Sequence, residues 1–212
     1  MKTSRNKIIF QNVAPAILAN ACVFLFSVVD GIFVGQGAGM QALGAVNLAL
    51  PFVLIVQALN AMASIGGVTI TAIRFGSGDK AGAQSAFMHA VTINLIVGCL
   101  VTLIGCGLTG PVCRLLGASE SYYELAKDYV FWWALFAIAN SVSLNLQSFF
   151  RNDGNPGLVA VTNVVITVLN IFLDWLFVFP LGKGVAGAAI ATGISQVAGL
   201  LVILTHFLFH KG

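Results

Sequence analysis

Two aspartates stand inside long apolar stretches of the sequence, at Asp30 and Asp174. An aspartate at the centre of a membrane helix costs about 2.5–3.5 kcal/mol on insertion scales, so it is rarely present without a function. Carboxylate oxygens suit Na⁺ as ligands, and a close pair of carboxylates also suits H⁺. The pair therefore predicts a cation site within a membrane. The alternative is that each aspartate is neutral and only hydrogen-bonded, which leaves the insertion cost unexplained.

Two further polar residues are expected at the depth of this pair. Asp30 and Asp174 lie five and six residues from the outer ends of their apolar stretches, and Thr192 lies six residues past the outer start of the next one. At about 1.5 Å per helical residue, the three reach a similar level in the outer half of the bilayer. Asn170 lies one turn from Asp174 on the same helix face. These four residues form the candidate cation site.

The elements that must position these residues are membrane-spanning helices. The chain has 212 residues, of which 58% are hydrophobic and only 8% charged, too few charges to cover a water-facing domain. A span needs about 20 mostly apolar residues. The fold class predicted is an all-α membrane protein, a bundle of six transmembrane helices at 13–35, 47–73, 86–110, 129–150, 158–180 and 186–209. A Gly-rich loop from Gly35 to Gly44 is expected after the first.

Positive charges predict the orientation of these spans. One side carries seven basic residues and the other carries three, Arg114, Lys127 and Lys183. The side richer in Lys and Arg belongs inside. Both termini are therefore predicted to be cytoplasmic, in a multi-pass protein of the cytoplasmic membrane. The seven are Lys2, Arg5, Lys7, Arg74, Lys80, Arg151 and Lys211.

Polar residues recur at helical spacing along four of the predicted spans. Any single one is explained equally well by hydrogen bonding between helices. Four stripes in one bundle favour a water-accessible cavity instead. The stripes are Gln57, Asn60, Ser64 and Thr71; Asn140, Ser143 and Gln147; Asn163, Thr167, Asn170 and Asp174; and Thr192, Ser195 and Gln196.

Several other functions are excluded by the same sequence. No Ser–His–Asp or Cys–His constellation is visible, so no enzyme activity and no cofactor are expected beyond a coupling ion, H⁺ or Na⁺. His206 and His210 lack the partners of a metal site. The match of residues 182–187 to GxGxxG follows no strand, so it is no dinucleotide site. No basic cluster suggests a nucleic-acid partner.

Four stretches of the sequence resemble the multidrug and toxic compound extrusion (MATE) transporter family, with most likeness to its bacterial drug-efflux branches. They follow the order and spacing of that family over most of the chain. They are Val29 to Gly35 with Ala42 to Ala45, Arg74 to Asp79, Phe150 to Pro156, and Asn170 to Asp174 with Gly184 to Thr192.

The resemblance assigns roles to individual residues. It implies that Asp30, Asn170, Asp174 and Thr192 form the cation site of the N-terminal lobe, and that Pro15 is linked to bending of the first helix. It also implies that Tyr129 and an amide of the fourth span border the substrate cavity. These cavity residues are Tyr129 and either Gln147 or Asn145.

The function that the resemblance implies is a drug:cation antiporter that exports amphipathic organic cations across the membrane. Members of the family have twelve spans in two lobes, so residues 1–212 are interpreted as the N-terminal lobe. Its expected partners are the bilayer, the drug and either a C-terminal lobe or a second copy. The alternatives are a lipid-linked precursor flippase, which needs intramembrane Arg or Lys for phosphates, and a non-transporting scaffold.

Overall fold

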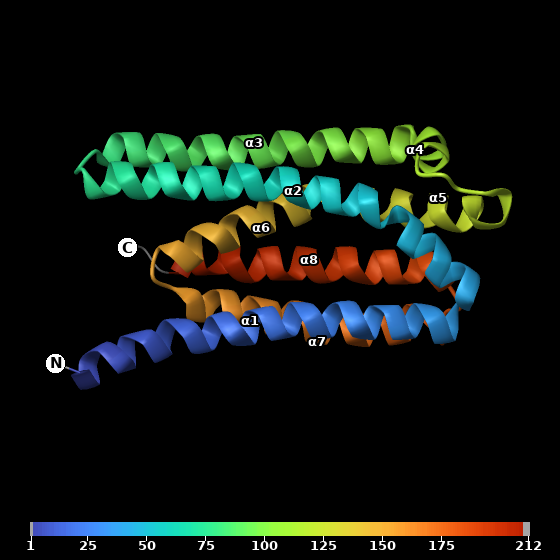
Figure 1. Cartoon of the computed structure of the whole chain (residues 1–212), viewed down its shortest axis with the longest axis horizontal. Coiled ribbons are helices and arrows are strands. Elements are labelled where there is room, and N and C mark those ends of the chain that lie inside the picture. Colours follow the sequence, from blue (N-terminus) through green and yellow to red (C-terminus); the bar gives the residue numbers. More distant parts are fainter. Residues whose placement is uncertain (1, 210–212) are drawn as a thin grey trace.

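The structure is a computed structural model that describes residues 2–209, and it is all-α over that range, as predicted (Figure 1). Helices account for almost all of the described residues because the chain is apolar throughout and lipid requires every backbone polar group to be satisfied internally. The helices are α1 (Lys2–Gly37), α2 (Met40–Gly76), α3 (Lys80–Gly107), α4 (Thr109–Leu115), α5 (Glu120–Leu135), α6 (Ala137–Asn152), α7 (Pro156–Val178) and α8 (Gly184–Phe209).

Six membrane crossings are present when one bent helix pair counts as a single span. Five helices are long and apolar enough to cross alone, and α5 with α6 forms the sixth candidate, bent by 53°. The predicted span at 129–150 therefore corresponds to this bent pair, with a break at Phe136 that the sequence did not predict. The predicted Gly-rich loop is wrong, because only Ala38 and Gly39 separate α1 from α2.

Contacts with neighbouring helices explain the bend at Phe136, because residues 129–150 contain neither proline nor glycine. Backbone carbonyls near the end of α5 are exposed by the bend, and α3 side chains satisfy two of them. Thr102 donates to the Ala134 carbonyl at 2.8 Å, and the Cys106 thiol lies 3.7 Å from the Phe131 carbonyl. The Phe136 ring occupies the space beside Gly193 of α8, where a Cβ would clash with it.

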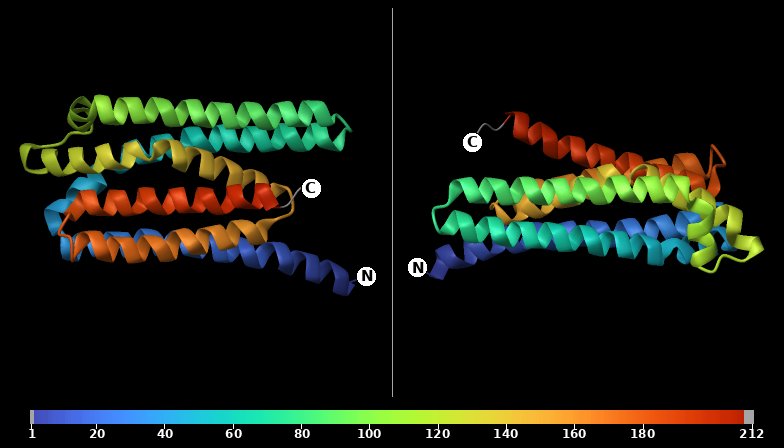
Figure 2. Two further views of the ribbon diagram at one scale, coloured as in Figure 1. Left: turned by 180° about the vertical axis from the view of Figure 1, so that it is seen from behind. Right: turned by 90° about the horizontal axis from the view of Figure 1, so that it is seen from above.

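The helices form two packed groups, which are joined by α5 and α6. α1 packs along α7, and α7 along α8, while α2 packs along α3. α6 contacts α2, α3 and α8 and so lies between the groups (Figures 1 and 2). Both ends of the described chain lie at the same end of the bundle as the α2–α3 and α6–α7 turns, and α4 lies at the opposite end (Figure 1). An even number of crossings requires this arrangement of the ends.

Which end of the bundle faces the cytoplasm stays a prediction from the basic residues, of which Lys211 lies outside the described residues. Ser77 and Ser119 are exposed at opposite ends of the bundle. Single cysteines at these positions, in a background without Cys22, Cys99, Cys106 and Cys113, can be labelled on whole cells with an impermeant maleimide. Labelling is expected at 119 and not at 77. The reverse pattern would invert the topology.

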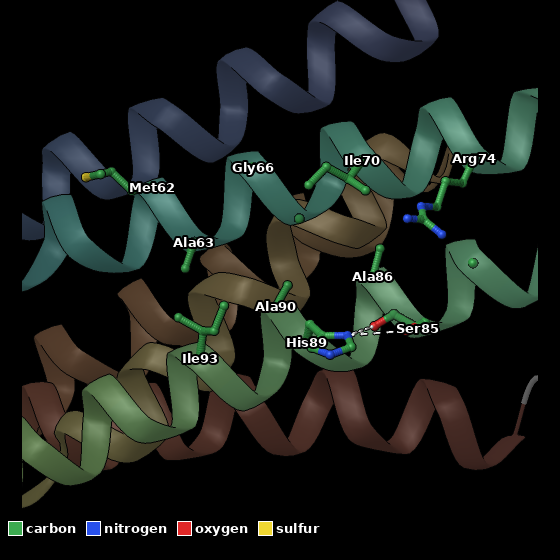
Figure 3. Close-up of a pocket in the computed structure, with 12 residues that line it drawn as sticks. Met62, Ala63, Gly66, Ile70, Arg74, Ser85, Ala86, His89, Ala90 and Ile93 are labelled. Carbon is green, nitrogen blue, oxygen red and sulfur yellow. Dashed lines mark hydrogen bonds between the residues drawn. The ribbon is translucent and has the colours of Figure 1, made fainter.

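A shallow groove runs along the face where α2 and α3 meet, lined by small residues of both helices (Figure 3). Gly67 faces Ala90 so closely that a Cβ on Gly67 would clash with the alanine methyl, whereas a Cβ on the neighbouring Gly66 meets nothing within 4 Å. The absence of a side chain at Gly67 therefore sets the spacing of these two helices.

The two glycines provide a matched pair of variants. Gly67→Ala is expected to destabilise the fold by about 1–3 kcal/mol, because overpacking pushes the helices apart. Gly66→Ala is expected to be neutral or slightly stabilising, since alanine favours a helix more than glycine does. Unfolding of the purified chain in detergent, followed by tryptophan fluorescence, measures the difference. Equal effects of the two substitutions would contradict this account of the packing.

Candidate functional site

The structure brings Asp30 and Asp174 together at the seam between α1 and α7. Asp174 is fully buried on α7, and Asp30 is half-buried on α1. The two carboxylates are close enough for their charges to interact. Two like charges in a buried position repel each other, so the pair is most stable when a proton or a metal cation neutralises part of the charge.

Three of the four carboxylate oxygens of this pair are buried and lack hydrogen-bond partners among the described residues. They are Oδ1 of Asp30 and both carboxylate oxygens of Asp174, and both amide atoms of Asn170 are also without partners. Asn170 lies close to the Asp174 carboxylate but outside hydrogen-bond geometry. Because buried polar atoms are normally satisfied, this set of oxygens fits an oxygen-coordinated cation such as Na⁺, or a proton.

The two other predicted residues near this level are Tyr129 and Thr192, which lie on different helices. Tyr129 is buried on α5 and lies within electrostatic range of both Asp30 and Asp174. Thr192 is half-buried on α8. In the described part of the chain no hydrogen bond joins Thr192 to the other three predicted cation ligands. Tyr129 is therefore close enough to feel the charges of the carboxylates, although no hydrogen bond among the described residues joins it to them.

Close packing of α1 against α7 fixes the position of the pair. At the outer end, Gly37 leaves room for Val178 and the Phe179 ring, and a Cβ there would clash with Val178. The Phe33 and Phe179 rings pack edge to face, with 5.7 Å between the ring centroids. On the inner side of the pair, Thr167 donates to the Cys22 carbonyl at 3.3 Å. Contacts on both sides of the carboxylates therefore hold the two helices in register.

A cavity of about 670 Å³ lies among α1, α2, α6, α7 and α8. Side chains of all four predicted polar stripes line it, and its access to water stays a prediction. Asn163 and Thr167 place it about two to three turns from Asp174, toward the N-terminal end of α7. The stripe residues on its wall include Gln57, Ser64, Asn140, Gln147, Asn163, Thr167 and Gln196.

Of the residues assigned to the cavity, only Gln147 lines it. Its amide nitrogen donates to Ser143 at 3.2 Å, and its oxygen accepts from Asn163 at 2.9 Å. Asn145 instead is fully buried and donates to Ser64 at 3.1 Å. Neither Asn145 nor Tyr129 is part of the cavity wall.

Sequence reasoning missed one charged residue of the cavity, Arg151 near the end of α6. It was counted only as a residue of the inner loop. The helical register could have revealed it, because Arg151 lies four residues after Gln147 and so on the same face. The cavity therefore has a basic group at its inner end.

Helix α1 connects the two parts of the site. Val23, Phe26 and Ser27 lie on the cavity wall, and Asp30 follows them one turn further along the same helix. Pro15 lies inside α1, which continues through it. A proline removes one helical hydrogen bond and weakens the helix locally. Any displacement of α1 at Asp30 therefore also changes the cavity.

Comparisons with known proteins identify the family of the chain. The family model MatE matches residues 15–176. The multidrug export protein MepA of Staphylococcus saprophyticus is 26% identical over 92% of the chain and 43% of its own length. The FAD transporter of Shewanella oneidensis is also 26% identical, over 93% of the chain and 45% of its own length.

A solved structure gives the same result for the fold. A MOP superfamily transporter from Pyrococcus furiosus superimposes with a TM-score of 0.86 at 31% identity, covering 97% of this chain and 45% of that one. The chain thus spans about half the length of the relatives it matches. The family match covers most of the chain, including Pro15, Asp30, Tyr129, Asn170 and Asp174, and the chain belongs to the MatE family of membrane transporters, which are not enzymes.

Proposed function

We propose that this chain is the N-terminal lobe of a drug:cation antiporter, in which Asp30 and Asp174 form the cation site with Asn170 and Thr192. The observation that supports this most is the pair of carboxylates, Asp174 fully buried and Asp30 half-buried, whose three buried oxygens lack partners among the described residues, beside a polar cavity. The coupling ion is H⁺ or Na⁺. The transported compounds are amphipathic organic cations, in keeping with the multidrug export protein among its relatives.

The coupling follows from the place of α1 in the structure. When the carboxylates hold a cation, their repulsion is reduced and α1 stays packed on α7. When the cation leaves, two charges face each other at the seam and favour its opening. Because α1 also forms one wall of the cavity, the two states of the seam give the cavity two shapes. Pro15 provides the weak point at which α1 bends.

The alternatives receive less support. A flippase for lipid-linked precursors needs several basic groups for phosphates, and among the described residues Arg151 is the only Arg or Lys on the cavity wall. A scaffold without transport activity leaves both the carboxylate pair and the cavity without a role. The proposed location is the cytoplasmic membrane of a bacterium, with a C-terminal lobe or a second copy as the facing half.

Flux measurements test this function. A two-lobe protein that carries residues 1–212 as its first half is placed in everted membrane vesicles, and ethidium uptake is followed while a proton or sodium gradient is imposed. Uptake is expected to require one of the gradients and to stop when an ionophore collapses it. Uptake that is indifferent to both gradients would contradict cation coupling.

A further inference from the structure

A second group of buried polar side chains lies between α2, α3 and α6, outside the Asp30–Asp174 site. Three of its members are hydrogen-bonded in series. Asn145 donates to the Ser64 hydroxyl at 3.1 Å, and Ser64 lies 3.5 Å from the amide oxygen of Asn94. All members are at most 2% exposed. This amide–hydroxyl cluster consists of Asn60, Ser64, Asn94, Ser141 and Asn145.

The helical register brings the other two members to one level. Asn60 precedes Ser64 by one turn on α2, and Ser141 precedes Asn145 by one turn on α6. The two helices run in the same direction, because the residues near both of their C-terminal ends line a single pocket. Asn60 and Ser141 therefore lie one turn from the bonded Ser64 and Asn145, toward the N-terminal ends of their helices.

Four polar atoms of the cluster have no partner among the described residues. They are both amide atoms of Asn60, the hydroxyl of Ser141 and the amide oxygen of Asn145. A buried polar atom without a partner costs free energy, and in a native structure it points to a missing water or ion. The cluster therefore needs a ligand.

The helix backbone can provide partners for the unpaired donors of the cluster but not for its unpaired acceptors. The Asn94 amide nitrogen donates to the carbonyl four residues earlier, at 2.9 Å, and Ser195 does the same at 2.7 Å. If the side chain of Asn60 or Ser141 rotates, its N–H or O–H group can likewise donate to the backbone carbonyl four residues earlier. Oxygens have no such option, because N–H groups inside a helix are already bonded. A cation coordinated by several of these oxygens at once is one way to satisfy the unpaired acceptors.

We propose that the amide–hydroxyl cluster binds a monovalent cation, with Na⁺ as the probe, through the oxygens of Asn60, Ser64, Ser141 and Asn145. Neutral carbonyl oxygens replace the hydration shell of monovalent cations in other membrane proteins. Ser64 also lies on the wall of the 670 Å³ cavity, which gives the ion a route from water. The site contains no carboxylate and is separate from Asp30 and Asp174.

The test uses the 212-residue chain purified in detergent, with Asp30→Asn and Asp174→Asn present so that the carboxylate pair cannot respond. Its melting temperature is measured by tryptophan fluorescence in NaCl and in choline chloride of equal concentration. Na⁺ at about 100 times its dissociation constant is expected to raise the melting temperature by about 5–10 °C. Asn60→Leu and Asn145→Leu are expected to remove this rise.

Two further variants complete the design. Thr92→Val removes a hydroxyl on the exposed face of α3 that bonds only to the Met88 carbonyl, and it should keep the full rise. Ser141→Ala is the smallest change in the cluster and should weaken the Na⁺ response several-fold even if a leucine variant fails to fold. No Na⁺-specific rise would mean that the cluster holds only water. A rise that survives Ser141→Ala and both leucine variants would place the ion elsewhere. Either result would overturn the proposal.

Discussion

Replacing Asp174 with Asn is expected to reduce cation-driven drug efflux to background in a two-lobe transporter that contains residues 1–212. The substitution keeps the size of the side chain and removes its charge, so the seam between α1 and α7 no longer alternates between a charged and a neutralised state. Asp174 is fully buried, and the neutral amide should leave the fold in place. Asp30→Asn is expected to have the same effect, because the proposed site needs both carboxylates.

The assay is drug resistance of cells together with ethidium efflux, with the amount of protein in the membrane measured in parallel. Asp153→Asn is the matched control, because Asp153 is exposed in the α6–α7 turn and should export normally. Normal export by both Asp30→Asn and Asp174→Asn, at normal protein levels, would show that the cation site is elsewhere.

Residues 1–212 by themselves are expected to insert and fold but to carry no sustained, gradient-driven drug transport. The described residues contain one bundle of up to six spans. Transporters built from repeats expose their site to each side in turn by moving one repeat against another. A single bundle supplies the cation site and one cavity wall without a facing half. The expected difference from a two-lobe protein is complete loss of sustained flux.

Liposomes measure this directly. The purified chain is reconstituted, a proton or sodium gradient is imposed, and ethidium efflux is followed beside liposomes without protein. Polar residues of the cavity wall such as Gln57 are exposed in the single chain, so self-association in the membrane is also expected. Sustained efflux by the chain alone would mean that two copies can face each other as two lobes do.

The general architecture could be predicted from the sequence because lipid imposes strict rules on a chain. Apolar runs of about 20 residues predict spans, and five of the six predicted spans are single helices in the structure. The break at Phe136 could not be predicted. It depends on Thr102 of α3 and Gly193 of α8, which are distant in the sequence, and residues 129–150 carry no local signal for it.

The sequence singled out the two aspartates of the candidate cation site, but it did not decide which amide of α6 lines the cavity. Asp30 and Asp174 stood out because a charge inside an apolar run is rare, and counting helical rise put them at one depth. The distinction between Gln147 and Asn145 could not be made from spacing alone. The two residues are two positions apart on α6 and so face different ways, one into the cavity and one into the amide–hydroxyl cluster. Which of the two residues lines the cavity depends on the position of α2, whose Ser64 bonds Asn145.

The central claim, that Asp30 and Asp174 act as one cation site, is tested most directly by infrared difference spectroscopy of the purified chain. Spectra are recorded while H⁺ or Na⁺ is added, and carboxyl and carboxylate bands report both kinds of binding at the side chains themselves. The account predicts cation-dependent carboxyl bands that disappear in Asp30→Asn and equally in Asp174→Asn, because each carboxylate responds through the other. Bands that persist in the variant with both substitutions, or two independent responses of which each single substitution removes only one, would contradict it.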